Sequence, residues 1–195
     1  MIFSPTFMRG TRRAGLLAIA VLAFLAGMPR AHSDPAAPLE YRVKAAFLYN
    51  FAQFVEWPDT VTNQAPFTIG VLGDDPVQQA LEETIAGKTL RNRPVRIKRL
   101  GRSDSLGDCH ILFISASEKT WLPQILARLK TASVLTVSDL PEFARQGGII
   151  SLMTQDHRIR FEINTAAAER AQLKISSKLL RLAEIVSAST EGENR

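Results

Sequence analysis

The chain contains one cysteine, Cys109, among its 195 residues. A single thiol excludes an intrachain disulfide, so an ordinary hydrophobic core must hold the fold together. An odd thiol is either buried and inert or a route to a disulfide-linked dimer. Because Cys109 stands just before the apolar run 111–114, we expect it to be buried and unpaired.

Sequence patterns of catalytic and metal sites are also missing. After residue 33 there are two histidines, His110 and His157. Cys109 and His110 are adjacent, so in a strand they point to opposite faces and cannot form a nucleophile–base pair. No Cys/His spacing suits zinc, and there is no nucleophile elbow, P-loop or dinucleotide-binding glycine motif. We therefore expect no enzyme activity, no metal ion and no cofactor.

The first 33 residues contain no acidic residue. They hold Arg9, Arg12 and Arg13, an apolar run over 14–28, and a small-residue triplet that ends at Ser33. This order describes a secretory signal peptide. The apolar run is shorter than the roughly twenty residues that span a bilayer, and no cysteine near the cut offers a lipid anchor. We expect cleavage after Ser33, export to the periplasm and no lipid anchor.

The net charge of the rest of the chain is close to zero. The full sequence has a net charge of +5, but segment 1–33 holds four of its 24 basic residues and none of its 19 acidic ones. The remaining twenty basic and nineteen acidic residues leave +1, so nucleic-acid binding loses its compositional support. One basic cluster remains, over 91–102. It is either an edge strand whose charges block unwanted pairing or a surface for an acidic protein or another anionic partner.

Residues 34–187 show the pattern of a single α/β domain, followed by a polar tail over 188–195. Continuous apolar runs indicate strands buried on both faces, and amphipathic segments between them indicate helices. This alternation predicts a mainly parallel sheet flanked by helices on both faces, with an antiparallel hairpin near the C-terminal edge. Strands are expected at 67–72, 95–100, 111–114, 134–137, 149–153 and 158–163. Helices are expected at 39–55, 77–86, 120–130, 141–145 and 178–186.

Two acidic residues follow the first of these strands. Asp75 is a good N-cap, and Pro76 suits the first position of a helix. The pair Asp74-Asp75 also resembles the magnesium site of a response-regulator receiver domain. That site needs an acceptor aspartate after the strand 111–114, where this chain has Ser115. Helix capping is therefore the favoured explanation.

The helix expected at 39–55 has more apolar surface than one sheet face needs. At 100° per residue its apolar side chains form two arcs that cover well over half of the helix, whereas a stripe of about 100° is enough to face a core. Either other parts of the domain or a subunit or partner interface must cover the surplus. The interface alternative selects Tyr41, Lys44, Leu48 and Val55, with Trp57 and Phe161 as aromatic anchors.

Two residues of that helix lead to further expectations. Lys44 interrupts the apolar surface, so it either extends its charge to solvent or meets a carboxylate. If Leu48 lies at an interface, Leu48→Glu weakens dimer or partner binding while the protein stays folded.

The stretch 43–58, VKAAFLYNFAQFVEWP, resembles the start of the YfiR/HmsC-like family of periplasmic proteins. The similarity extends in order through most of the predicted mature chain. It continues over 67–73, 109–114, 134–139, 147–150, 160–164 and 176–186.

The resemblance implies a regulatory role without catalytic residues. YfiR-like proteins repress an inner-membrane diguanylate cyclase through its periplasmic sensing domain. An OmpA-like outer-membrane lipoprotein or envelope stress relieves this repression and raises cyclic di-GMP and biofilm formation. We expect this chain to act in the same way, as a homodimer, by shifting the cyclase toward its inactive state. Cys109 matches a family cysteine but has no partner here, so redox sensing through an internal disulfide is not expected.

The competing interpretation is a periplasmic module that binds a small molecule. Its ligand would lie at the C-terminal ends of the strands, near Asp74, Ser115 and Asp139, where open α/β sheets commonly bind ligands. Such a module is stabilised by its small molecule, whereas a repressor is stabilised by the periplasmic domain of a cyclase.

Overall fold

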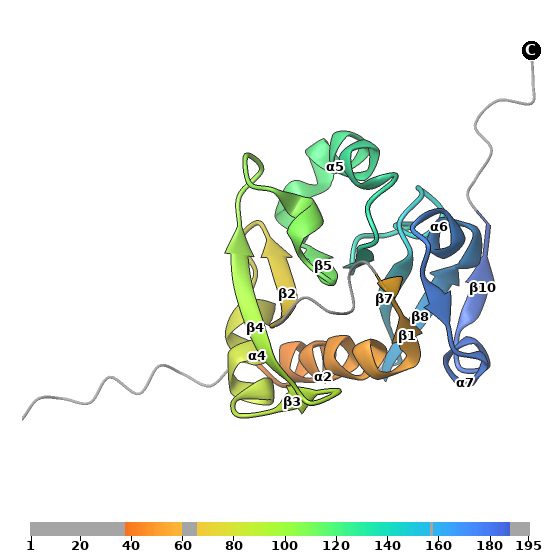
Figure 1. The fold of residues 1–195 in the computed structure, drawn as a ribbon. Helices are drawn as coiled ribbons and strands as arrows, with labels where there is room; N and C mark the ends of the chain where they lie inside the picture. Colours follow the sequence, from red (N-terminus) through yellow and green to blue (C-terminus); the bar gives the residue numbers. More distant parts are fainter. Residues whose placement is uncertain (1–37, 60–65, 157, 188–195) are drawn as a thin grey trace, which may run out of the picture. The chain divides into compact units, whose positions relative to one another are not determined.

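The computed structural model of the chain describes residues 38–59, 66–156 and 158–187. The expected signal peptide, its cleavage site at Ser33, His157 and the polar tail lie outside the described residues. The described part contains an eight-stranded sheet in the order β10-β8-β7-β6-β5-β2-β4-β3 (Figure 1). Its strands are β2 (Phe67–Leu72), β3 (Thr89–Leu90), β4 (Arg93–Leu100), β5 (Ile111–Ile114), β6 (Leu135–Ser138), β7 (Ile150–Gln155), β8 (Arg158–Asn164) and β10 (Glu184–Val186).

Two further strands, β1 (Val55–Glu56) and β9 (Lys174–Ile175), form a separate antiparallel pair. None of the described helices is long and apolar enough to cross a bilayer. The α-helices are α2 (Leu39–Phe54), α4 (Val77–Ile85), α5 (Leu122–Leu129), α6 (Thr165–Arg170) and α7 (Ser177–Leu180). The 3-10 helices are η1 (Leu106–Asp108) and η2 (Ala116–Trp121).

The sheet is parallel over most of its width, which confirms the predicted fold class. The five adjacent strands β4, β2, β5, β6 and β7 run parallel to one another. The hairpin of β7 and β8 is antiparallel, as expected. It lies one strand in from the edge, because β10 pairs with β8 in parallel.

Alternate residues of the central strands enter two different cores. Ile111 and Phe113 of β5 pack in one core together with residues of α2 and α4. Leu112 and Ile114 pack in the other core together with residues of α5. Side chains alternate across a strand, so the continuous apolar run of β5 is explained by helices that cover both faces of the sheet.

The strand order reverses direction at β2. The chain leaves β2 through α4 to reach β4 on one side, whereas β5, on the other side of β2, continues through α5 to β6. Because α4 and α5 belong to different cores, these connections cover opposite faces of the sheet. Ligands of open α/β sheets bind at the carboxyl ends of strands beside such a reversal.

The helix predicted at 178–186 is wrong. The segment forms the single turn α7 and then strand β10, which pairs with β8 from Glu184↔Glu162 to Val186↔Asn164. A short isolated helix is marginal, and the free edge of β8 supplies backbone partners that the local sequence does not reveal. The short helix predicted at 141–145 is also wrong. That segment is a series of turns in which Glu142 has a φ of 58°, outside the helical region.

Candidate functional site

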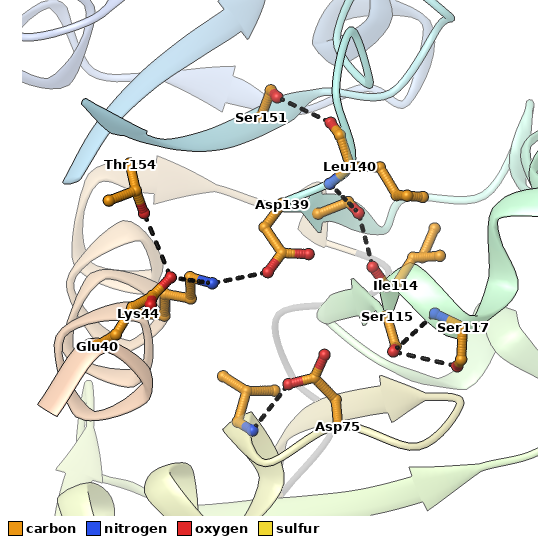
Figure 2. A network of polar contacts seen from close by, with 12 residues as sticks. Glu40, Lys44, Asp75, Ile114, Ser115, Ser117, Asp139, Leu140, Ser151 and Thr154 are labelled. Carbon is orange, nitrogen blue, oxygen red and sulfur yellow. Dashed lines mark hydrogen bonds and ion pairs between the residues drawn. The ribbon is translucent and has the colours of Figure 1, made fainter. Parts of the chain in front are cut away.

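Polar side chains from three strand ends and one helix converge at the carboxyl edge of the sheet (Figure 2). Asp75 follows β2, Ser115 follows β5, and Asp139 follows β6. Lys44 reaches the same place from α2, and Figure 2 shows the carboxyl groups of Asp75 and Asp139 directed toward a common space. We call these four residues the switch-point cluster.

Lys44 is the buried charge of the switch-point cluster, with 5% of its surface exposed. Its Nζ lies 2.7 Å from Oδ2 of Asp139 and 2.8 Å from Oε1 of Glu40. Burial alone would lower the pKa of Lys44, but the hydrogen bonds and charges of the two carboxylates outweigh it and raise this pKa. The hydrogen bond from Lys44 lowers the pKa of Glu40. Of the two alternatives for Lys44, the pairing with carboxylates is the one observed.

Asp75 caps the helix that follows it, as the sequence predicts. Its Oδ1 accepts a hydrogen bond of 2.9 Å from the backbone N–H of Val77, the first residue of α4, so Pro76 precedes the helix rather than beginning it. Burial raises the pKa of Asp75, and the negative charge of Asp139 raises it further. Oδ1 of Asp139 is buried and has no hydrogen-bond partner among the described residues. The cluster therefore holds two carboxylates close together.

The Ser115 side chain hydrogen-bonds residues of the adjacent loops. Its Oγ donates to the carbonyl of Asp74 at 3.0 Å and accepts from the backbone N–H of Ser117 at 3.2 Å. The Asp74 side chain lies outside the cluster, since it is 90% exposed and pairs with Arg99 at 2.7 Å. The sequence suggested a ligand site near Asp74, Ser115 and Asp139. Ser115 and Asp139 do lie in the cluster, but the neighbouring residue Asp75 lies there instead of Asp74.

Asp75→Asn should raise the thermal midpoint of unfolding at pH 7 by a few degrees at most. The folded state raises the pKa of Asp75, so ionisation of this group above its unfolded value of 3.8 opposes folding. An asparagine keeps the oxygen that accepts from Val77 and removes the charge. Below the unfolded pKa both states bind the proton, so the gain should vanish as the pH falls below 3.8. A gain that persists in acid, or a loss at pH 7, would show that Asp75 is not destabilised by its charge.

Among the described residues, Ser115 carries the hydroxyl group of the switch-point cluster. Ser115 faces carboxylates and backbone groups rather than a histidine, so no activated nucleophile is formed there. The described residues contain no group of three His, Cys, Asp or Glu side chains that could hold a metal ion. The ion pair between Lys44 and Asp139 can hold α2 against the carboxyl ends of the strands.

The residues selected for an interface lie mostly inside the domain. Leu48 and Val55 have no exposed surface. Trp57 and Phe161 are 6% exposed; the Trp57 Nε1–H donates to the carbonyl of His110, and Phe161 packs against Phe51. Tyr41 alone of the six is partly exposed. A partner could touch the buried ones only if the domain opened, so Leu48→Glu tests folding rather than binding.

Cys109 is buried and free. Its Sγ–H donates to the carbonyl of Leu106 at 3.3 Å, and burial raises the pKa of the thiol to about 11. A thiol of this kind is protonated at neutral pH and unreactive. The expectation that Cys109 is buried is confirmed.

Solved structures resemble the chain at low sequence identity. One is a conserved domain protein from Vibrio cholerae, with a TM-score of 0.54 and 10% identity over 74% of this chain; the match covers 59% of that protein. Another is an ABC domain in complex with L-Trp from Streptococcus pneumonia, with a TM-score of 0.46 and 9% identity, covering 61% of this chain and 55% of that one. No curated protein matches.

Comparison with protein families gives a match over most of the chain. The model described as YfiR/HmsC-like matches residues 41–184. The matched part runs from α2 to the start of β10 and includes all four residues of the switch-point cluster. The chain belongs to the YfiR/HmsC-like family.

Proposed function

We propose that the chain represses an inner-membrane diguanylate cyclase by binding its periplasmic sensing domain. The family match over 41–184 carries this proposal, because at the level of the family it supports a periplasmic regulator of cyclic di-GMP signalling. A regulatory role without catalysis belongs to the same proposal and rests on the family match. An OmpA-like lipoprotein as the relieving partner and a homodimer as the active form belong to the same proposal.

Repression of this kind needs only differential affinity. A binding partner moves a two-state cyclase from mostly active to mostly inactive by favouring the inactive state, and a full reversal from 1:99 to 99:1 takes about 5.5 kcal/mol. Interfaces of modest size supply such energies. The two ends of α2 offer exposed apolar side chains for such a contact, since Leu39 at its start is 74% exposed and Phe54 at its end is 36% exposed.

The test is intracellular cyclic di-GMP in the source organism with and without the gene. We expect deletion to raise cyclic di-GMP, the complete gene to restore the lower level, and a version lacking residues 1–33 to fail because it is not exported. In vitro, the exported chain should raise the thermal midpoint of the cyclase's periplasmic domain. Unchanged cyclic di-GMP under several envelope stresses would overturn the proposal and favour the alternative of a small-molecule module at the switch-point cluster.

A further inference from the structure

We propose that the outer side of β4 is a docking site for an extended segment of a partner protein, in which acidic residues alternate with apolar ones. The segment would add a strand to the sheet. This inference goes beyond the proposed repression and does not depend on whether the partner is a cyclase. It rests on the basic cluster 91–102, which the proposed function leaves without a role.

The first observation is that most of β4 forms an open sheet edge. Strand β3 pairs only with Arg93 and Pro94 at the beginning of β4. Within the described ranges no other strand covers this side of 95–100. In Figure 1, β4 is the last long strand on this side of the sheet, with the short β3 near its beginning. An edge of this length presents backbone donors and acceptors to any extended chain of suitable sequence.

The direction of the free backbone groups follows from one hydrogen bond. The N–H of Gly73 donates to the carbonyl of Leu100 at 3.3 Å, so Leu100 presents its carbonyl toward β2. Backbone groups alternate sides along a strand. Val95, Ile97 and Arg99 therefore present their N–H and C=O groups away from the sheet. A bound strand would satisfy them, which is how sheet edges recognise extended peptides.

The second observation is a groove beside this edge. Val95 and Ile97 pack against the core that contains α4. With Ile85 of α4 they line a groove of about 580 Å³. Alternate side chains of an added strand point to the same face as their partners on β4. Every second side chain of the segment would therefore enter the groove, and an apolar residue suits that place.

The third observation is uncompensated positive charge on the opposite face of the edge. Arg96 and Lys98 are exposed, and neither has an ion pair or a side-chain hydrogen bond among the described residues. Their neighbours are engaged, since Arg99 pairs with Asp74 and Arg102 with Glu118. The remaining side chains of the segment would stand opposite Arg96 and Lys98, where opposite charges favour pairing.

The basic residues of β4 could instead serve only to prevent unwanted strand pairing, and the two roles predict different binding. Basic residues on an edge prevent pairing with another basic edge, including that of a second copy. They do not repel an acidic strand, and they increase its association rate at low salt. A purely protective edge binds no peptide, whereas the proposed site distinguishes peptides by their charge and by their ability to form a ladder.

The experiment uses the exported full chain and a short probe peptide in which glutamate alternates with valine. We expect the probe to bind, and to bind more weakly as salt rises. A lysine–valine peptide of the same length should not bind. A glutamate–valine peptide with N-methyl groups on alternate residues cannot form a ladder on that edge and should bind at least about tenfold more weakly. Equal binding of the N-methylated peptide, or no binding of the unmodified probe, would overturn the proposal.

Charge reversal locates the site on the protein. Arg96→Glu/Lys98→Glu should weaken binding of the probe at least about tenfold, because like charges opposite each other disfavour pairing. The matched control is Arg170→Glu/Arg181→Glu, which makes the same charge change at exposed residues of α6 and the end of α7 and should bind the probe as the unchanged protein does. Circular dichroism checks the fold of both variants. If the two variants bind equally, the probe does not dock on β4.

Discussion

Lys44→Met should lower the free energy of unfolding by about 3 kcal/mol at pH 7. Methionine keeps the length of the side chain and its apolar contacts, but it leaves the Asp139 carboxylate without the donor that lies 2.7 Å away. Removing one partner of a buried ion pair costs about 3–5 kcal/mol, because the other charge stays buried and unpaired. We take the lower end, since the Asp139 side chain is 18% exposed. Denaturant unfolding with an unchanged m-value measures the loss.

Two control variants assign this effect to the pair. Lys44→Met/Asp139→Asn leaves no unpaired charge and should recover most of the loss, which a double-mutant cycle reports as coupling. Glu40→Gln should cost only about 0.5 kcal/mol, because the Glu40 side chain is 50% exposed and an exposed i,i+4 pair contributes little. If Lys44→Met loses less than about 1 kcal/mol, or the double variant is the least stable of the three, Lys44 does not stabilise the domain through Asp139.

The difference in the free energy of unfolding between the unchanged protein and Lys44→Met should depend on pH. The folded state raises the pKa of Lys44, so its contribution is present below the unfolded value of 10.5 and is lost as the pH rises through the folded value. The folded state lowers the pKa of Glu40, so its contribution is present above 4.5 and is lost as the pH falls through the folded value. The stability gap between the unchanged protein and Lys44→Met should therefore narrow at both ends and be widest between them.

The buried strands could be predicted because their signal is local. The apolar run 67–72 is the strand β2 with the same limits, and 111–114 is β5. A strand covered on both faces needs apolar residues at every position, so six or four consecutive residues are enough to recognise it. A carboxylate partner for Lys44 was one of two alternatives that the sequence left open. That partner could not be identified as Asp139, because 95 residues separate the two and only the sheet order brings them together.

The sequence misled where tertiary contacts decide. The surplus apolar arc of α2 allowed an interface, but the same domain buries Leu48 and Val55 completely, in one core with α4. A periodicity shows that a face is covered and does not show what covers it. The helix α6 was missed although its signal was present: the Asn164 side chain accepts from the N–H of Ala167, an N-cap followed by good helix formers.

Some short motifs of the sequence have a packing reason that only the structure reveals. Gly147 has a φ of 104°, a conformation that favours glycine, at the end of the turns that follow β6. Gly148 has no such φ, so its requirement for glycine has to be explained by space. A Cβ on Gly148 would collide with the ring of Phe143, and Phe143 has no exposed surface. Because Gly148 has no side chain, the ring of Phe143 fits beside it in the core.

Gly148→Ala should therefore destabilise the protein by about 3 kcal/mol, at the upper end of overpacking in a rigid core. The matched control is Gly107→Ala, where the nearest atom to the added carbon is Cβ of Ala132 at 4.0 Å; there the free energy of unfolding should change by less than about 0.5 kcal/mol. Phe143→Leu shortens the obstructing side chain, so the cost of Gly148→Ala should be smaller in that background, by a coupling of at least about 1 kcal/mol. If the losses of Gly148→Ala and Phe143→Leu simply add in the double variant, a backbone shift relieves the collision, and Gly148 is required for another reason.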